Sequence, residues 1–430
     1  MTQDQMHHWR KISKEQEFKA VPLYGETVAD VVVIGAGFTG LNAAIELAIS
    51  GARVIVLEGA DIGQAASGRN NGQVIPHHSK KSPSEFVELL GKKRGDLYNE
   101  MVATAPLRLF DLISRYKIKC DLVSQGWMQA CHSLEALKRA EIFHKEWKAL
   151  GCKVEWLDRA SIAEKVGGGD FLGGWKAFDA GYLNPYALTQ GLARAAAQEG
   201  ATIHTQSMVK AIEKEGNGWI VKTDTGRVRT AKVLVAANAV AGHFWPSLHK
   251  AMIPVRVYQI ATAPFSADLQ KKVLPGREGV SDTSRDIRAF RYDSTGALAM
   301  VGSHTVWFNA AERGKSKVMR RLTALLPQVP NVPAAEYWEG VIAVVPDKVP
   351  RLMELAPGVI FAGIYSGRGI AMSTVWGRNA AQILTGRLSD SAMPMPVSGL
   401  KTVAGHGVGV QVARFIHPWH RLQDRLDKRD

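Results

Sequence analysis

Hydrophobic and polar positions near the start of the chain follow the alternation of a βαβ unit. Residues 30–34 form a short continuous apolar run, residues 39–50 carry apolar positions at helical spacing, and residues 53–57 form a second apolar run. Gly51 ends the helical segment. The pattern predicts two strands joined by a helix, which is the repeating unit of an α/β fold.

The same alternation returns near the other end of the chain. Residues 359–363 form a buried apolar run, followed by a glycine-rich turn and by helical spacing as far as about residue 384. Asn184 and Pro185 predict a helix start, because an Asn side chain caps the first amides and proline suits the first helical position. Further predictions are helices within 82–150 around a short strand near Trp127, a helix over 187–198, strands within 219–238, and a β-rich region over 254–345 with one helix near 317–326.

Composition favours an ordinary globular protein. The 430 residues, 46% of them hydrophobic, predict two or three domains. The net charge of +14 favours an anionic ligand, an acidic membrane surface or nucleic acid, and does not choose among them. Three irregularly spaced cysteines make no disulfide framework and no metal pattern, so we expect a reducing cytoplasm and no metal site. The polar first 29 residues predict no secretion signal, and no apolar run is long enough for a transmembrane helix.

Gly35, Gly37 and Gly40 form a GxGxxG motif between the first strand and the first helix. The first glycine permits a tight turn, the second lets the backbone approach a pyrophosphate, and the third allows close helix packing. The positive end of the helix dipole faces the phosphates. Glu58 ends the second strand, where a carboxylate accepts hydrogen bonds from an adenosine ribose. The combination predicts a bound dinucleotide, and both NAD and FAD fit it.

Longer segments resemble the FAD-dependent amine and amino-acid oxidases of the D-amino-acid oxidase superfamily, which includes sarcosine oxidase and glycine oxidase. Within it, the chain looks most similar to γ-glutamylputrescine oxidase-like enzymes. The segments are DVVVIGAGFTGLNAAIELA from residue 30, SGRNNGQ at 67–73, GYLNPYALTQGLARAAAQEGA at 181–201, WEGVIAVVPDKVP at 338–350 and YSGRGIAMSTVWGR at 365–378. The resemblance implies FAD as the cofactor. It implies non-covalent FAD, because Gly340 and the SGRNNGQ loop offer no Cys or His where covalent members carry one.

The resemblance also implies a fold and its division. We expect an α/β protein with a Rossmann-type FAD-binding domain of the glutathione-reductase-like kind, and an α+β substrate domain built on a mixed or antiparallel sheet. The expected parts are an N-terminal extension over 1–26, the FAD-binding domain over 27–80, 181–245 and 346–390, the substrate domain over 81–180 and 246–345, and a C-terminal tail over 391–430.

The family's cofactor contacts carry over to matching positions. The SGRNNGQ loop is expected along the flavin, and the YSGRG turn presents amides to the flavin edge where negative charge develops on reduction. The expected set is Gly35, Gly37, Phe38, Thr39, Gly40, Glu58, Ser67, Arg69, Asn70, Asn71, Gly72, Gln73, Val209, Gly363, Ser366, Gly367, Arg368, Gly369 and Ile370. Two positions depart from the family: Arg368 replaces a common His, and Ile364 replaces a common Gly, so the local backbone is expected to differ.

Oxidation of an amine by a flavin depends mainly on positioning of the substrate, so no strong general base is required. The expected catalytic candidates are Arg368, Tyr258, His78 and Lys348. Arg368 brings a permanent cation to the flavin, and a lysine such as Lys348 assists reaction with O2. Further candidate substrate contacts are His77, Gln259, Arg288, Arg291, Trp338 and Glu339. For each candidate, the ordinary alternative is a solvated charge or a packed aromatic ring.

The predicted activity is oxidation of a C–N bond in a small amine or amino acid, with the imine hydrolysed and O2 reduced to H2O2. The expected substrate is γ-glutamylputrescine-like or another primary or secondary amine, such as a cyclic imino acid. One rival is a quinone-linked dehydrogenase, favoured only by the basic tail over 412–426, which would rest on an acidic membrane. Other rivals are flavin-dependent RNA-base modification and a non-catalytic flavin-binding subunit. Pro418 is expected to interrupt the tail helix, so docking on the protein's own surface is the expected role of the tail.

Overall fold

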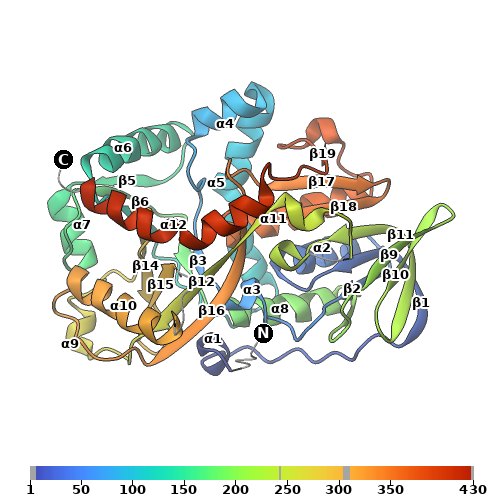
Figure 1. Cartoon of the computed structure of the whole chain (residues 1–430), viewed down its shortest axis with the longest axis horizontal. Coiled ribbons are helices and arrows are strands. Elements are labelled where there is room, and N and C mark those ends of the chain that lie inside the picture. The colour runs from blue at the N-terminus through green and yellow to red at the C-terminus, as the bar shows by residue number, and fades with distance from the viewer. Residues whose placement is uncertain (1–5, 242–243, 304–309, 428–430) are drawn as a thin grey trace.

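The computed structural model describes residues 6–241, 244–303 and 310–427, which are organised around two large sheets (Figure 1). The first sheet contains β1 (Gly25–Ile34), β2 (Val54–Leu57), β8 (Thr202–His204), β9 (Ala211–Glu215), β10 (Gly218–Lys222), β11 (Gly226–Val235), β17 (Arg351–Ala356), β18 (Val359–Gly363) and β19 (Ser398–Gly399). Its order is β19-β17-β18-β11-β1-β2-β8, with the β9–β10 hairpin attached to β11. The central strands β18, β11, β1, β2 and β8 are parallel to their neighbours in this series. This is the α/β arrangement expected from the sequence.

Both faces of the first sheet are buried, as its central strand shows. Val31 and Val33 of β1 belong to one apolar cluster, whereas Val32 and Ile34 belong to the cluster on the other face. The first face is covered by α2 (Phe38–Ile49), α5 (Lys92–Arg115), α8 (Pro185–Gln198) and α11 (Gly369–Leu384). Strands with both faces covered are uniformly apolar, which explains the continuous hydrophobic runs in the sequence.

Two helix contacts bring distant segments of the chain together. Helix α2 packs against α8 on one side and α11 on the other. A Cβ atom at Gly377 of α11 would lie 2.3 Å from the carbonyl oxygen of Thr39, so only glycine allows this approach. The start of α8 is capped as predicted, since Asn184 Oδ1 accepts hydrogen bonds from the amides of Tyr186 and Ala187, both at 3.1 Å.

The second sheet is mixed. It contains β4 (Trp127–Ala130), β5 (Val154–Leu157), β6 (Gly174–Ala177), β12 (Ile253–Ala261), β13 (Gly279–Asp282), β14 (Ala289–Tyr292), β15 (Leu298–Ser303) and β16 (Glu336–Val344). Neighbouring strands are antiparallel except β13 and β4. The surrounding helices are α4 (Pro83–Leu90), α6 (Leu134–Ala149), α7 (Arg159–Val166), α9 (Ala267–Gln270) and α10 (Ala310–Leu325). A short ladder of β3 (Gln73–Val74) and β7 (Gly181–Tyr182) stands apart from both sheets.

The two ends of the chain both lie on this framework. A short helix, α1 (His8–Lys11), packs beside α8 and β16, and the terminal helix α12 (His406–Leu426) crosses the front of the molecule near β12 (Figure 1). The prediction that Pro418 interrupts the tail helix is wrong, because α12 runs continuously through that position. A proline inside a helix removes one backbone hydrogen bond, and α5 contains another at Pro106. Within the described ranges, no helix is long and apolar enough to cross a membrane.

The sequence predictions of fold class and of most elements are confirmed. The helix near 317–326 begins earlier, at residue 310, and the strand over 359–363 has the predicted bounds. The strands of the first sheet fall in the segments expected for the FAD-binding domain, apart from β19, which lies in the expected tail, and the first two residues of β1, which lie in the expected N-terminal extension. The domain boundaries themselves stay a prediction.

Candidate cofactor and active site

The glycine loop between β1 and α2 presents a bare backbone. No side chain caps α2 at Gly37. A Cβ atom there would lie 2.8 Å from Ser67 Oγ, and one at Gly40 would lie 2.0 Å from the Gly35 carbonyl oxygen. Ser67 Oγ accepts a hydrogen bond from the Phe38 amide at 3.1 Å, which ties the loop to the SGRNNGQ segment. A helix N-terminus without a side-chain cap suits a phosphate group.

Glu58 is held in place by the glycine loop and by the turn that follows β2. Its two carboxylate oxygens accept hydrogen bonds from the amides of Ala36 at 2.8 Å and Ala60 at 3.1 Å. Burial raises the pKa of this carboxyl group. The carbonyl of Glu58 accepts from the Ser207 amide at 2.8 Å, which brings the segment of Val209 alongside. Each carboxylate oxygen accepts more than one hydrogen bond, so the group keeps capacity for ribose hydroxyls.

The SGRNNGQ segment folds into a self-bonded loop after the short helix α3 (Ala66–Arg69). Asn70 Nδ2 donates to the carbonyls of Ala66 at 3.0 Å and Ser67 at 2.8 Å, and Asn70 Oδ1 accepts from the Gly72 amide at 2.8 Å. Gly72 has a φ of 82°, and a Cβ atom on it would lie 2.0 Å from the Leu183 carbonyl oxygen. We call residues 67–73 the flavin loop.

Two buried polar atoms near the flavin loop have no hydrogen-bond partner among the described residues. They are Asn71 Oδ1 and Gln64 Nε2. Buried polar atoms are ordinarily paired, so an acceptor and a donor left open here indicate a polar ligand. The bare glycine loop, the Glu58 carboxylate and these open atoms fit FAD. Contact of the individual predicted residues with FAD stays a prediction.

The YSGRG turn joins β18 to α11 through left-handed backbone. Ile364, Ser366 and Gly367 have φ values of 65°, 49° and 93°. The Ile364 amide donates to Asn238 Oδ1 at 3.1 Å. A β-branched residue is strained at such a φ, which glycine adopts freely. Ile364 therefore holds a strained backbone conformation that glycine would adopt freely.

Arg368 follows this turn and stacks on an aromatic ring. Its guanidinium carbon lies 5.4 Å from the centroid of Trp127. Burial lowers the pKa of Arg368 to about 10, so the group stays a cation at neutral pH. The ring of His77 lies 4.4 Å from the same Trp127 ring. His77 Nδ1 bonds to the His78 carbonyl oxygen at 2.9 Å, and Nε2 is buried without a partner among the described residues.

Burial, followed by the charge of Arg368, holds the pKa of His77 well below its usual value. The imidazole is therefore neutral. Because a carbonyl oxygen only accepts, Nδ1 carries the proton and Nε2 keeps a free lone pair. His77 thus offers an unpaired acceptor beside Trp127, the ring that also contacts the Arg368 cation.

His78, the predicted catalytic neighbour, has the surroundings of a packed histidine. Its Nε2 bonds to Asn99 Oδ1 at 2.7 Å, and its ring stacks on Tyr98 with centroids 5.1 Å apart. Burial lowers the pKa of His78 to about 3. These contacts occupy the ring, and its predicted part in catalysis gains no support from them.

Adjacent residues of β12 point to opposite sides. Tyr258 packs in the apolar cluster that includes Val318 of α10, and its ring lies 5.7 Å from Tyr337. Gln259 instead faces the flavin loop, where its Oε1 accepts from Asn71 Nδ2 at 3.2 Å. The alternation of a strand explains the difference. Gln259, rather than the predicted catalytic Tyr258, lies on the cofactor side.

The remaining candidates are mostly engaged with protein groups. Arg288 pairs with Asp282, Glu339 pairs with Arg256 at 2.8 Å, and Trp338 donates to a flavin-loop carbonyl. The Gln73 side chain bonds to groups of the second sheet, including the Val280 carbonyl at 2.9 Å. Lys348 is half-buried, and burial lowers the pKa of its ammonium group.

Sequence reasoning missed three residues of the site. Trp9 is fully buried against the flavin loop, Tyr365 OH shares a 2.7 Å hydrogen bond with Thr39 Oγ1, and Trp127 forms the wall beneath Arg368. A lone tryptophan within a polar N-terminal stretch was the available signal for Trp9. Tyr365 and Trp127 carry no comparable signal, because their partners are distant in the sequence.

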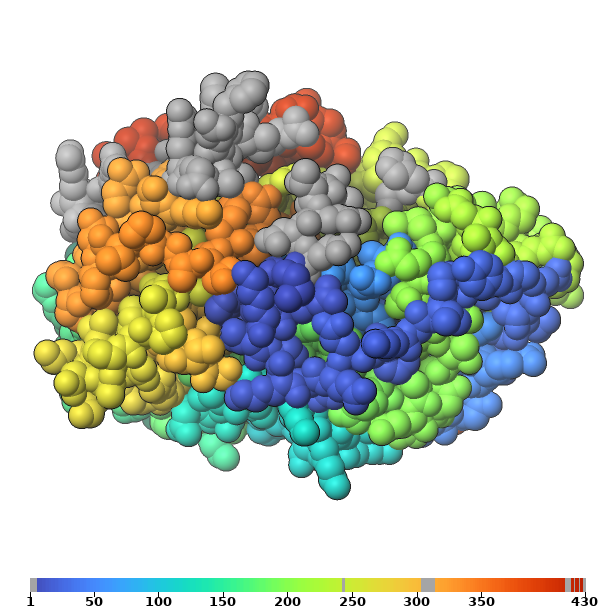
Figure 2. Space-filling model, turned by 90° about the horizontal axis from the view of Figure 1, so that it is seen from below, coloured from blue at the N-terminus to red at the C-terminus, as the bar shows by residue number. Residues whose placement is uncertain are grey.

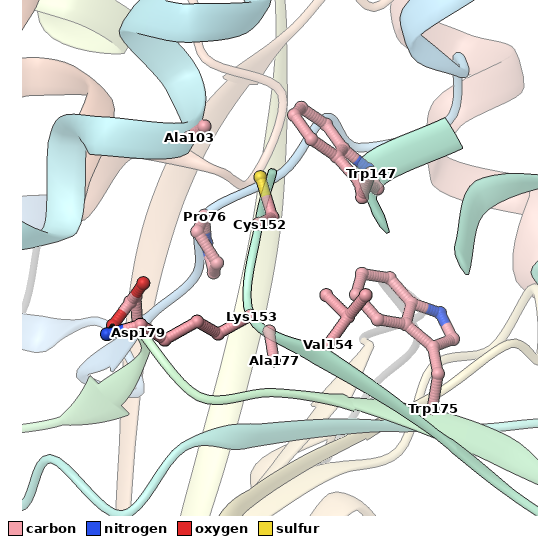
Figure 3. A pocket seen from close by; sticks show the side chains of 9 residues that line it. All are labelled: Pro76, Ala103, Trp147, Cys152, Lys153, Val154, Trp175, Ala177 and Asp179. Atoms are coloured by element: carbon pink, nitrogen blue, oxygen red, sulfur yellow. Dashed lines mark ion pairs between the residues drawn. The ribbon is translucent and has the colours of Figure 1, made fainter. Parts of the chain in front are cut away.

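A pocket lies next to Trp175, whose ring packs against His77 and Trp127 (Figure 3). Its lining is Pro76, Ala103, Trp147, Cys152, Lys153, Val154, Trp175, Ala177 and Asp179, and Figure 3 shows the two tryptophan rings on one side of it. Trp175 separates the pocket from His77, whose ring lies 4.9 Å away. None of the lining residues belongs to the predicted cofactor set, so the pocket is distinct from the glycine loop.

Known proteins resemble the chain over most of its length. A "Probable oxidoreductase OrdL" of Haemophilus influenzae is 30% identical, with 94% of this chain and 95% of that protein covered. The gamma-glutamylputrescine oxidoreductase of Escherichia coli is 28% identical over 83% of this chain and 84% of that protein. The crystal structure of glycine oxidase from Geobacillus kaustophilus matches with a TM-score of 0.72 at 20% identity, covering 87% of this chain and all of that one. The last similarity shows a shared fold.

The family model described as DAO, FAD dependent oxidoreductase, matches residues 30–383. The match includes the glycine loop, Glu58, the flavin loop and the YSGRG turn. The cofactor is therefore FAD, and Gly340 and the flavin loop offer no Cys or His side chain for a covalent bond to it. The chain belongs to the DAO family of FAD-dependent oxidoreductases and is an enzyme that acts on amines or amino acids.

Proposed function

We propose that the protein oxidises the C–N bond of a small amine that also carries an anionic group, with O2 as the electron acceptor. A γ-glutamylputrescine-like compound is the first candidate, and another secondary or primary amine, such as a cyclic imino acid, is the second. Bound FAD supplies the two-electron acceptor that takes a hydride from the substrate carbon and is reoxidised by O2 to give H2O2. The residues around the YSGRG turn carry the proposal.

Three cations meet beside this turn. The Val345 amide donates to Ser366 Oγ at 3.4 Å, and Ser79 Oγ donates to the Ser366 carbonyl, also at 3.4 Å. These bonds join the segments that contain Lys80, Lys348 and Arg368. Lys80 is the exposed member of the three. Desolvation and then the charges of Arg368 and Lys348 lower its pKa, whereas the charge of Asp282 raises it.

None of these three side chains forms an ion pair within the part of the chain that the structure describes. By contrast, the buried Lys176 pairs with Glu278 at 2.7 Å. Neighbouring cations without a direct ion-pair partner repel one another, and an anionic ligand relieves that repulsion. This is the single observation on which the proposed substrate class rests.

The proposed roles follow from the chemistry of the groups. Arg368 binds the substrate carboxylate, since its planar guanidinium is held by stacking on Trp127. His77 Nε2 accepts a hydrogen bond from the substrate nitrogen and orients it, because this nitrogen has a free lone pair. Lys348 and Lys80 add positive charge for the anionic end and for reduction of O2.

The test begins with the purified holoenzyme. Its flavin absorbance and its H2O2 production are followed as it meets a panel of polyamine conjugates, N-methyl amino acids, cyclic imino acids, D- and L-amino acids, and uncharged amine analogues of each. Bleaching of the flavin and H2O2 release by acidic members, with their uncharged analogues at least tenfold poorer in kcat/KM, supports the proposal. Equal turnover of charged and uncharged amines would sink the anionic substrate class.

The same experiment decides the acceptor. Fast reoxidation of the flavin by air supports the oxidase, whereas bleaching without H2O2 points to the quinone-linked dehydrogenase of the same fold. RNA-base modification is not proposed, because the similarity to a tRNA-modifying protein covers 60% of this chain, whereas the similarity to an oxidoreductase covers 94%. A cytoplasmic location, suggested by cysteine use, is part of the proposal.

A further inference from the structure

The carbonyl groups of the flavin loop are held by side chains from distant parts of the chain. Trp9 Nε1 donates to the Asn70 carbonyl oxygen at 2.8 Å, and Arg291 Nε donates to the Asn71 carbonyl oxygen at 2.8 Å. The carbonyl oxygen of Arg69 accepts from Trp338 Nε1 at 2.9 Å and also from Gln259 Nε2. We call Trp9, Gln259, Arg291 and Trp338 the carbonyl clamp.

The clamp is a single packed unit. The Arg291 guanidinium carbon lies 4.0 Å from the centroid of the Trp9 ring, and the Trp9 and Trp338 rings meet edge to face at 5.3 Å. All three side chains are at most 2% exposed. Arg291 also donates to the Leu183 carbonyl at 2.8 Å, beside Gly72, where any Cβ atom would collide with it. Burial lowers the pKa of Arg291 to about 10, so it remains charged at neutral pH.

The N-terminal segment, residues 7–12, is anchored on both sides of the clamp. His8 Nε2 bonds to Asp293 Oδ2 at 2.8 Å, and Asn184 Nδ2 donates to the Trp9 carbonyl at 2.9 Å. Figure 2 shows this dark blue part of the chain lying across one face, between the orange and green parts. The segment therefore bridges the second sheet and the start of α8.

We infer that the N-terminal segment is a working part of the cofactor site, in which Trp9 is a positioning residue that fixes the flavin loop for FAD. The carbonyl oxygens of Arg69, Asn70 and Asn71 all accept hydrogen bonds from the clamp, and these bonds fix the orientation of the three peptide planes. Among the described residues, Trp9 is the single donor to the Asn70 carbonyl, whereas the Arg69 carbonyl has two donors. Loss of Trp9 N–H leaves a buried carbonyl unpaired, which favours other loop conformations. FAD affinity falls by the fraction of molecules that leave the competent conformation.

The matched test compares three tryptophan-to-phenylalanine variants of the full chain. The variants are Trp9→Phe, Trp338→Phe and Trp219→Phe, and each removes an indole N–H that donates to a backbone carbonyl. Trp219 is the control, because its Nε1 donates to the Pro357 carbonyl at 3.2 Å, away from the flavin loop. Flavin fluorescence titration of each apoprotein gives the FAD Kd, and thermal unfolding of the same apoprotein gives its stability. We expect Kd to rise roughly tenfold in Trp9→Phe, about twofold in Trp338→Phe, and not at all in Trp219→Phe.

A general structural role for Trp9 would instead make loss of FAD follow loss of stability across the three variants. Unchanged FAD affinity in Trp9→Phe, or equal weakening in Trp219→Phe, overturns the inference. Neither result bears on the substrate class, because no substrate is present in this titration.

Linkage supplies a second readout. If docking of the N-terminal segment strengthens FAD binding, FAD strengthens docking by the same factor. Trypsin cleavage after Lys11 and Lys14 of the wild-type protein is therefore expected to slow severalfold on addition of FAD, and this protection is expected to shrink in Trp9→Phe. Cleavage at equal rates with and without FAD in the wild-type protein would contradict the coupling.

Discussion

The guanidinium of Arg368 and the indole ring of Trp127 form a stacked pair, 5.4 Å from carbon to ring centroid, at the start of α11. The pair joins a cation of the YSGRG turn to β4 of the second sheet. The ring of His77, 4.4 Å from the same Trp127 ring, adds a neutral acceptor. The Arg368 cation and the His77 Nε2 lone pair therefore lie beside the same Trp127 ring, which suits a substrate with an acidic end and an amine.

Replacement of Arg368 by Gln is expected to raise KM for the acidic amine about tenfold to a hundredfold, with a smaller fall in kcat. A charged hydrogen bond to a carboxylate contributes roughly 1.5–3 kcal/mol, and this contribution is lost. Arg368→Lys keeps the charge and loses the planar stack, so an intermediate KM is expected. Steady-state kinetics of H2O2 release measures both variants.

The control for Arg368 is Arg387→Gln, which makes the same change in net charge at an exposed position. Its KM is expected to stay within twofold of the wild-type value. An Arg368→Gln enzyme with unchanged KM and a lower kcat would assign the arginine to the chemical step instead of to substrate binding.

Gly72→Ala is expected to abolish FAD binding. The new Cβ atom would lie 2.0 Å from the Leu183 carbonyl oxygen, and the residue has a φ of 82°. Gly51→Ala is the matched control, because Gly51 has a φ of 84° and open space around its Cβ position. Backbone strain alone costs about 1 kcal/mol, so the control is expected to bind FAD with a slightly lower melting temperature. The ratio of flavin to protein absorbance after purification distinguishes the two; full flavin content in Gly72→Ala would contradict the geometry.

The fold around the glycine loop and the cofactor FAD could be predicted from the sequence because their signals are local. The glycine motif, Glu58 and the turn after residue 363 each depend on neighbours within a few positions, and periodicity identified the strands around them. The Asn184 cap is another local signal, and the structure confirms it. The prediction for Pro418 failed because a local rule was applied where helix α12 tolerates the residue.

The substrate half could not be predicted with the same success. A strand pattern does not say which face meets the flavin loop, so Tyr258 was predicted as catalytic and its neighbour Gln259 only as a further substrate contact, although β12 turns Gln259 toward the loop. Nothing in the sequence indicates that the Arg291 guanidinium donates to backbone carbonyls. Contacts such as Trp9 with Asn70 join residues 61 positions apart and depend on the tertiary structure alone.

Acid is expected to destabilise the protein through its buried histidines. The pKa of His78 is about 3 in the folded protein, against about 6.5 in an unfolded chain. The unfolded state therefore binds the proton first. The contribution of His78 to stability is complete above pH 6.5 and falls by about 1.4 kcal/mol for each pH unit below it, down to the folded pKa. Burial lowers the pKa of His7 in the same way, also to about 3.

His78→Gln removes one of these titrations. Between pH 6.5 and pH 5.5, the free energy of unfolding is expected to fall about 1 kcal/mol less in the variant than in the wild-type apoprotein, as measured by urea denaturation. The control is His249→Gln, at an exposed position, which is expected to follow the wild-type pH dependence. Parallel curves for His78→Gln and the wild type would mean that His78 is not buried as a neutral group.

The last turns of helix α12 are held on the second sheet by Asp424. Its two carboxylate oxygens accept from the amides of Arg285 at 2.9 Å and Asp286 at 3.0 Å, and the Arg285 guanidinium pairs with Asp427 as well. Asp424→Ala leaves both amides without these partners, so the end of α12 is expected to separate from the second sheet. Trypsin cleavage within residues 414–425 is expected to quicken roughly tenfold, as followed by mass spectrometry. Asp268→Ala, which removes an exposed ion pair with Lys271, is the control and is expected to leave the cleavage rate unchanged. If Asp424→Ala also lowers KM for the acidic amine, the docked helix restricts access to the Lys80 side of the site; an unchanged KM assigns α12 to stability alone.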